Sequence, residues 1–210
     1  MTAKRGSGHA ELNQRIGASG ADSIWIGDSV QLRAYEPEDA DSSPLFFSSA
    51  DDRSGSMVRT PRSRVATRKF FEEFAEKRPG GEAAGFDLVI ARREDNVMVG
   101  GIGVHNVDQI NGTFAYGLGV RPEHKGHGYG AEAVVLLLRF MFDERRFQKC
   151  EAHVYEYNAA SIALHRKLGF VEEGRLRRHL FQAGEYHDEF RFGITVEEFH
   201  ELYPLLRSKV

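Results

Sequence analysis

The chain has a single cysteine, Cys150, and no run of apolar residues that approaches the roughly 18 needed to cross a bilayer. One cysteine excludes a disulfide framework within the monomer and is typical of a reducing compartment. Basic residues are not in excess either, since 28 Lys and Arg stand against 31 Asp and Glu, for a formal charge of −3. The N-terminus lacks the apolar segment of a signal peptide. These absences predict a soluble, cytoplasmic protein with neither a membrane nor a nucleic-acid partner.

What is present indicates one globular domain, because 210 residues, 41% of them apolar, suffice for a core. Residues 1–22 carry Gly, Ser, Ala and charge without a sustained period and predict a flexible N-terminal arm, leaving 23–210 as a single domain. Hydrophobic patterning predicts hairpins over 24–35, 86–104 and 174–195, further strands over 114–120 and 150–155, helices over 63–77, 131–146, 158–169 and 197–206, and a polar loop over 53–64. The sum is a mixed α/β domain with antiparallel hairpins.

The most informative segment is 120–130, which reads VRPEHKGHGYG and leads directly into the helix predicted over 131–146. That helix is apolar nearly all round, so it is expected to be buried with its N-terminus fixed in place. Three glycines at alternate positions would leave the backbone amides of 126–131 open to an anion, which the helix dipole also favours. A plain strand-to-helix turn is the alternative, although one or two glycines suffice for it. The full dinucleotide and Walker signatures are absent.

A second motif lies about thirty residues further on, where 158–170 reads NAASIALHRKLGF. Together with Lys125-x-x-Gly128-x-Gly130, it resembles the Gcn5-related N-acetyltransferase (GNAT) superfamily, whose cofactor motif has Gln or Arg in place of Lys125. Residues 30–33, 37–40 and 184–188 resemble the branch that contains ribosomal-protein N-terminal and spermidine acetyltransferases. The resemblance covers about residues 24–200.

The resemblance implies a GNAT fold of the α/β (α+β) class, with a central, mixed, mostly antiparallel sheet flanked by helices. Its fourth and fifth strands, 114–120 and 150–155 here, are expected to splay apart, and Gly117 and Gly119 suit a bulge that opens them. The implied cofactor is acetyl-CoA, with its pyrophosphate on the glycine loop and its pantetheine between the splayed strands. No residue is assigned to a metal. The cofactor contacts that the resemblance implies are Leu118, Val120, Lys125, Gly126, His127, Gly128, Tyr129, Gly130, Ala131, Asn158, Ser161, His165 and Lys167.

The implied activity is direct acetyl transfer to a primary amine, which needs no nucleophilic side chain, so Cys150 is expected to be a small buried strand residue. Many GNAT enzymes protonate the departing thiolate with a Tyr at the position of His165. The ribosomal-protein branch uses the serine at the position of Ser161. Both stay candidates, against the plainer interpretations of a first-turn capping serine and a structural histidine.

The sequence points less clearly to the general base that takes the proton of the amine than to the proton donor for the thiolate. Ribosomal-protein acetyltransferases carry a Glu on the fourth strand where this chain has Ala115. His105 on the third strand and Glu156 after the fifth are the best placed alternatives, and the usual pKa of histidine suits a base at neutral pH. Each could equally be a solvated loop residue, and a water chain ending on a backbone carbonyl would leave no trace in the sequence.

Acidic residues suggest the acceptor, gathering at Glu36, Glu38, Asp39, Asp41, Asp51 and Asp52, and at Glu185, Asp188 and Glu189. They could attract a polyamine, another small-molecule amine or a protein N-terminus, or simply be solvated turns. A different class of function is a non-catalytic GNAT-fold module that binds or senses acyl-CoA. Homodimers are common in this branch, so a homodimer is an open expectation.

Overall fold

The structure is a computed structural model that describes residues 8–18, 23–41, 62–76 and 85–206. Its elements follow in this order: α1 (Gly8–Ala18), β1 (Val30–Arg33), η1 (Pro37–Ala40), α2 (Arg64–Glu76), β2 (Asp87–Arg92), β3 (Met98–Asp108), β4 (Thr113–Val120), η3 (Pro122–His124), α3 (Tyr129–Arg139), η4 (Phe140–Glu144), β5 (Lys149–Tyr155), α4 (Ala159–Leu168), β6 (Val171–Gln182), β7 (Glu185–Thr195), α5 (Val196–Leu202) and η5 (Pro204–Leu206). This order confirms the predicted mixed α/β class. None of the described helices is long and apolar enough to span a membrane.

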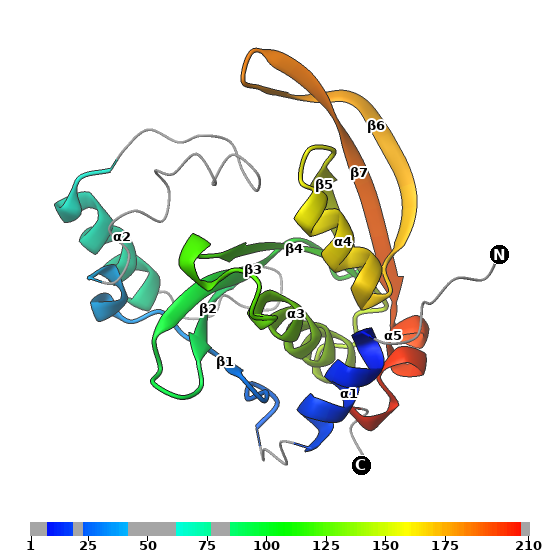
Figure 1. Ribbon diagram of the computed structural model, residues 1–210, viewed down its shortest axis with the longest axis horizontal. Coiled ribbons are helices and arrows are strands. Elements are labelled where there is room, and N and C mark those ends of the chain that lie inside the picture. Colours follow the sequence, from blue (N-terminus) through cyan, green and yellow to red (C-terminus); the bar gives the residue numbers. More distant parts are fainter. Residues whose placement is uncertain (1–7, 19–22, 42–61, 77–84, 207–210) are drawn as a thin grey trace.

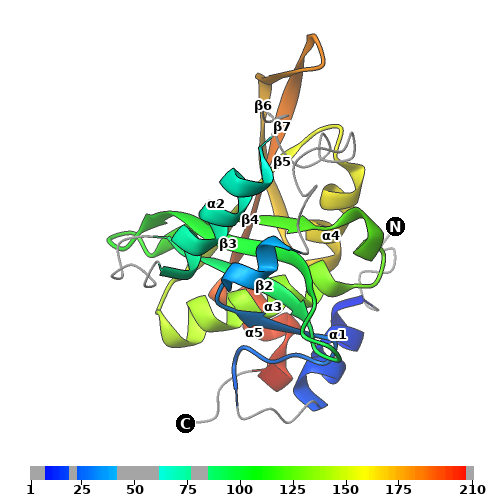
Figure 2. The same cartoon turned by 90° about the vertical axis from the view of Figure 1, so that its left-hand side faces the viewer.

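The strands form one seven-stranded sheet in the order β1-β2-β3-β4-β5-β7-β6. Every neighbouring pair is antiparallel except β4 and β5, which run parallel. The hairpins β2–β3 and β6–β7 fall where alternating apolar residues flank turn residues, as predicted. The β6–β7 hairpin extends well beyond the rest of the sheet (Figures 1 and 2). The predicted mixed, mostly antiparallel sheet is therefore confirmed.

Helices cover both faces of the sheet (Figures 1 and 2). On one face α3 crosses β1 to β4, with α4, α1 and α5 beside it. Leu136, Leu137 and Leu138 of α3 are fully buried, as expected of a helix that is apolar nearly all round. On the other face η1 and α2 pack over the first strands, where Phe71 meets Val89 and Ala91. The face on which α2 lies is called the α2 face below.

The long central helix differs from its predicted span at both ends. It begins at Tyr129 rather than at residue 131, because Gly128 in a left-handed conformation serves as its N-cap. After Arg139 the α-helix gives way to the π-helical turn η4, which ends at Glu144 rather than at residue 146. A sequence pattern does not distinguish an α-helical from a π-helical last turn, because both keep the same face buried.

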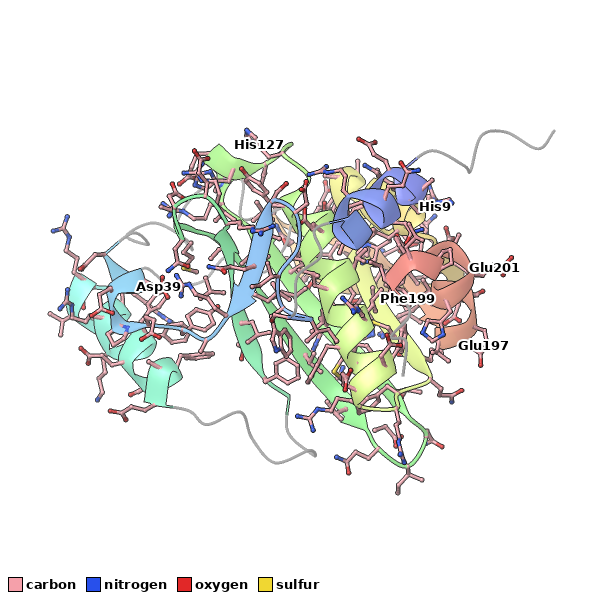
Figure 3. The ribbon with its side chains drawn as sticks, turned by 90° about the horizontal axis from the view of Figure 1, so that it is seen from below. His9, Asp39, His127, Glu197, Phe199 and Glu201 are labelled. Atoms are coloured by element: carbon pink, nitrogen blue, oxygen red, sulfur yellow. The ribbon has the colours of Figure 1, made fainter. Side chains whose placement is uncertain are left out.

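The prediction of a flexible arm over residues 1–22 is wrong for α1. Leu12 and Ile16 are buried in the main core, and the Asn13 side chain accepts a hydrogen bond from the backbone of Leu205 at 3.2 Å. Helix α1 lies beside α5 and α4 (Figure 3). The rest of that arm, and the part of the predicted 53–64 loop before residue 62, lie outside the described residues.

Candidate active site

The strands β4 and β5 are paired at one end only. Their ladder consists of Thr113 with Lys149, Phe114 with Cys150, and Ala115 with Glu151, and within residues 85–206 it stops there. Residues 116–120 of β4 and 152–155 of β5 therefore face each other as unpaired edges, with N–H and C=O groups available to a third partner. We call this region the splay. It confirms the predicted divergence of the fourth and fifth strands, and Leu118 and Val120 lie on its β4 side.

The splay does not arise from a bulge at Gly117 and Gly119, so that prediction is wrong. The β3–β4 ladder runs regularly through both glycines, and its register shift lies between His105 and Asp108. Strand β5 stays paired with β7 along its whole length. Each half of the sheet therefore follows its own partner, and the twist of the two halves separates β4 from β5.

At the open end of the splay, the glycine loop forms a cradle of backbone amides. Gly126 and Gly128 both have φ of +83°, and a Cβ added at either would meet no atom of the described residues within 4 Å. Helix α3 starts directly after Gly128 without a side-chain cap, so its first N–H groups have no partner within the helix. Open amides at the positive end of a helix fit a pyrophosphate, and only glycine adopts these dihedral angles without strain.

A buried carboxylate anchors the first turn of α3. Glu132 accepts hydrogen bonds from the backbone N–H groups of Ser29 at 2.8 Å and Val30 at 3.2 Å, and the Arg15 guanidinium of α1 lies 3.8 Å away. A Cβ at Gly27 would lie 2.1 Å from this carboxylate, so glycine is needed for the close approach. The contacts tie the cradle to β1 and α1. Sequence reasoning missed Glu132 because its partners are backbone groups about a hundred residues away.

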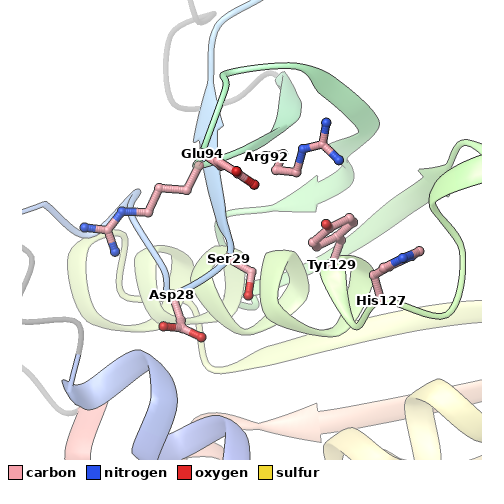
Figure 4. A pocket seen from close by; sticks show the side chains of 7 residues that line it. Asp28, Ser29, Arg92, Glu94, His127 and Tyr129 are labelled. Atoms are coloured by element: carbon pink, nitrogen blue, oxygen red, sulfur yellow. The ribbon is translucent and has the colours of Figure 1, made fainter.

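Two arginines lie beside the cradle. Arg92 ends β2 and Arg93 begins the β2–β3 turn. With Asp28, Ser29 and Glu94 they line an open hollow of about 590 Å³ next to His127 and Tyr129 (Figure 4). The His127 ring stacks on the Tyr129 ring at 5.4 Å. Arg92 is also paired with Asp95 at 2.6 Å. Two adjacent arginines at a hairpin turn are not a recognised sequence motif, so the sequence did not indicate that they lie beside the cradle.

Helix α4 begins as predicted. The Asn158 side chain caps it by accepting a hydrogen bond from the backbone N–H of Ser161 at 3.0 Å, and Gly169 ends it at φ +95°. Ser161 is partly buried, with its Oγ 3.3 Å from Nδ1 of His165. Lys167 on α4 and Lys125 in the glycine loop are both exposed.

His165 is not the accessible proton donor that the sequence suggested. Only 5% of the residue is exposed, and its ring stacks against Phe192. Nδ1 lies 2.7 Å from the Ser161 carbonyl oxygen and Nε2 lies 2.7 Å from the Tyr116 hydroxyl, so Nδ1–H donates and Nε2 accepts. Burial lowers the pKa of His165, which keeps the ring neutral. These contacts argue against both predicted roles, thiolate protonation and pantetheine binding, and point to a structural pair with Tyr116.

The pair gives a testable consequence for stability. Replacing Tyr116 by Phe should lower the free energy of unfolding by about 1–3 kcal/mol, because the buried Nε2 of His165 loses its donor. The double variant Tyr116→Phe/His165→Leu should be more stable than the single variant, since the orphaned acceptor is then removed as well. Urea unfolding of the three proteins measures both effects. A Tyr116→Phe protein as stable as the unmodified chain would contradict the hydrogen bond.

The same pair predicts a pH dependence. The pKa of His165 is lower in the folded protein than in the unfolded chain, so the unfolded chain binds more protons and stability rises with pH. Stability should therefore fall as the pH drops below about 6.5, the ordinary histidine value. The double variant should lose part of this slope. If the free energy of unfolding of the double variant changed between pH 7.5 and 5.5 as steeply as that of the unmodified protein, His165 would not be held neutral.

The two predicted bases lie in different surroundings. His105 is exposed on β3 and pairs in register with Ala115, one strand away from the splay. Glu156 is not free, because Arg175 holds it at 2.9 Å and His187 lies 3.4 Å away. Because both carboxylate oxygens of Glu156 are already in contact with basic side chains, the structure argues against Glu156 as the base.

Arginines neutralise four acids of the clusters that were expected to attract an amine. Asp39 pairs with Arg33 at 2.7 Å and Asp41 with Arg68 at 2.7 Å, while Asp188 and Glu189 pair with Arg175 and Arg191. Asp51 and Asp52 lie outside the described residues. The fold decides which arginine pairs with which acid. Counting acids along the sequence therefore overestimated the unpaired negative charge available to an amine.

Cys150 is fully buried on β5, and burial raises the pKa of its thiol well above the ordinary value. A neutral, inaccessible thiol is inert. This agrees with the expectation of a small buried strand residue.

The sheet, the splay and the amide cradle together define a protein that can hold an extended ligand with a phosphate group at one end. Comparisons with known proteins give the family. Residues 29–171 match the model of the acetyltransferase (GNAT) domain. The SPbeta prophage-derived uncharacterized N-acetyltransferase YokL of Bacillus subtilis (strain 168) is 40% identical over 178 residues, covering 83% of this chain and 94% of that protein. The chain therefore belongs to the GNAT acetyltransferase family.

More distant relatives have named substrates. The spermidine N(1)-acetyltransferase of Escherichia coli (strain K12) is 25% identical over 105 residues, covering 50% of this chain and 56% of that protein. The crystal structure of spermidine N-acetyltransferase from Vibrio cholerae in complex with CoA and spermine shares the fold, with a TM-score of 0.69 and 22% identity over 81% of this chain and 98% of that one. The family match and the similarity to YokL show that the chain is an N-acetyltransferase. GNAT acetyltransferases use acetyl-CoA, so the predicted cofactor is confirmed.

Proposed function

We propose that the protein transfers an acetyl group from acetyl-CoA directly to the nitrogen of a cationic primary amine. The observation that carries this proposal is the splay with the glycine cradle at its open end. An extended ligand can use both at once, because the cradle suits an anion and the unpaired strand edges suit amide groups.

In this proposal the amides of residues 126–131 hold the pyrophosphate, and Lys125 and Lys167 add exposed positive charge. Leu118 and Val120 offer their backbone groups to the pantetheine amides, as a neighbouring strand would. Asn158 orders the start of α4 beside them. The bound cofactor supplies the activated acetyl thioester. The roles of His127, Tyr129, Gly130 and Ala131 are to shape the cradle and start α3.

The chain's own groups have three tasks in the transfer. A base must take a proton from the ammonium group, because only the neutral amine is nucleophilic. Backbone N–H groups on the open edge of β4 stabilise negative charge on the carbonyl oxygen. Ser161 is the proposed proton donor to the sulfur, since it lies in the first turn of α4 and is partly exposed, whereas His165 is buried.

The acceptor class is supported by the relatives and by chemistry. The spermidine acetyltransferase of Escherichia coli is similar to this chain in sequence, and that of Vibrio cholerae is similar in fold. The substrate that names both enzymes is a cationic primary amine. A protein N-terminus is also a primary amine and would present the same ammonium group. The acceptor proposed is therefore a cationic primary amine, and the test compares a polyamine, another small amine and a peptide N-terminus.

A panel of acceptors tests the function. Spermidine, other small cationic amines and peptides with a free N-terminus are each incubated with acetyl-CoA, and thiol release is followed. We expect turnover that depends on the amine, with a product resistant to hydroxylamine, as an amide is. Acetyl-CoA binding without turnover on any amine would contradict the proposal and favour a binding module instead.

A further inference from the structure

The closed end of the splay carries a polar cluster on the α2 face. Ala115 is the last β4 residue paired with β5, and its partners in register are His105 on one side and Glu151 on the other. Residues paired in register lie on the same face of a sheet, so these side chains project together. His153, two residues after Glu151 on β5, lies on that face and on the unpaired length of the strand. It therefore borders the splay directly.

Glu151 is the carboxylate at this end without an arginine partner. Its side chain is 43% exposed, and among the described residues the one basic side chain within 4 Å of its carboxylate is His153, whose Nε2 lies at 3.9 Å. Glu156 and Glu189, the other carboxylates on or next to these strands, are paired with Arg175 and Arg191. Glu151 can therefore receive a cation from outside the chain.

His153 has the properties of a base. Burial, followed by the positive charge of Arg191, lowers its pKa, so the ring is neutral at pH 7. Four charged or titratable groups face it: Glu151 on its own strand, Glu189 and Arg191 on β7, and His105 on β3. Arg191 contacts the ring nitrogens and is itself held by Glu189 at 2.9 Å. A proton taken up by His153 would be stabilised by two carboxylates and then released to solvent, because Arg191 keeps it weakly held.

We propose that Glu151 and His153 form the acceptor side of the reaction, in which Glu151 binds the ammonium group and His153 takes its proton. This inference rests on the proposed function. His105 is less well placed to act as the base, because β4 separates it from the splay, whereas His153 borders the splay.

Acetyl transfer from the thioester to the amine forms one C–N bond, breaks one C–S bond and moves two protons off the nitrogen. The ammonium gives one proton to the unprotonated ring nitrogen of His153, displacing the Arg191 contact there, and the ring becomes an imidazolium. The nitrogen lone pair forms the new C–N bond to the acetyl carbon, and the C–S bond breaks with its electron pair going to sulfur. The sulfur takes a proton from Ser161, and Ser161 regains one from the acylated nitrogen through solvent. The sum is amide plus thiol, and His153 returns its proton to water.

Two variants separate the two roles. His153→Gln should lower kcat by about 10²- to 10⁴-fold, the usual contribution of a general base, and should remove the loss of activity at acid pH that His153 protonation causes. Glu151→Gln should instead raise KM for the amine about tenfold with a smaller change in kcat. Titration calorimetry of the amine alone, without acetyl-CoA, should show weaker binding to Glu151→Gln. An NMR titration of the His153 ring should give a pKa below 6.5.

The matched control is His179→Gln, an exposed histidine on β6, which should keep kcat, KM and the acid limb. Acetyl-CoA affinity should be unchanged in all three variants, which confirms that each is folded. Full kcat and an unchanged pH profile in His153→Gln, or unchanged amine binding in Glu151→Gln, would overturn this inference alone. Absence of turnover by the unmodified protein on every amine would instead overturn the proposed function, and this inference with it.

Discussion

Replacing Gly128 by Val is expected to weaken acetyl-CoA binding by at least about a hundredfold. A side chain at this position would occupy the open space above the amides, and its φ of +83° would also be lost or strained. Losing about two hydrogen bonds from amides to a charged phosphate, at about 1.5–3 kcal/mol each, accounts for that factor. Titration calorimetry with acetyl-CoA measures it.

Gly184 is the matched control for this experiment. It lies in the β6–β7 turn with a φ of +87°, and within the part of the chain that the structure describes a Cβ there would likewise meet nothing within 4 Å. The change Gly184→Val therefore imposes a similar backbone strain, about 1–2 kcal/mol, far from the cradle. It should leave the affinity for acetyl-CoA unchanged. Equal loss of affinity in both variants would mean that strain, rather than the cradle, is responsible.

Replacing Leu12 by Ala is expected to lower the free energy of unfolding by about 2–5 kcal/mol, the usual cost of a buried leucine. Leu12 lies on α1 and is buried in the main core, although the sequence suggested a flexible arm. Gln14→Ala on the same helix removes an exposed side chain and should change stability by less than about 0.5 kcal/mol. Urea unfolding gives both values. If the Leu12→Ala and Gln14→Ala variants were equally stable, the result would support the prediction of a flexible arm and contradict the packing of α1 on the core.

The sequence was a good guide to features encoded by neighbouring residues. The glycine run, the Asn158 cap and the β2–β3 hairpin each depend on local backbone chemistry, and each lies where the pattern indicated. The splay was expected from the resemblance to GNAT proteins. Its physical origin, two half-sheets that follow different partners, is visible only in the register.

Other features depend on contacts between residues far apart in the sequence and were missed. Helix α1 has few apolar positions, and its order comes from packing on α4, α5 and η5. The bond between Tyr116 and His165 joins residues 49 positions apart. The pairing of Glu156 with Arg175 likewise could not be read from either residue alone. In each case the fold supplies a partner from a distant part of the sequence.

The most direct test of the central claim is a crystal structure of the protein with CoA bound. We expect the phosphates on the amides of residues 126–131 and the pantetheine between β4 and β5, hydrogen-bonded to the open edge near Leu118 and Val120. CoA bound elsewhere on the molecule, or β4 and β5 paired along their full length, would contradict the account.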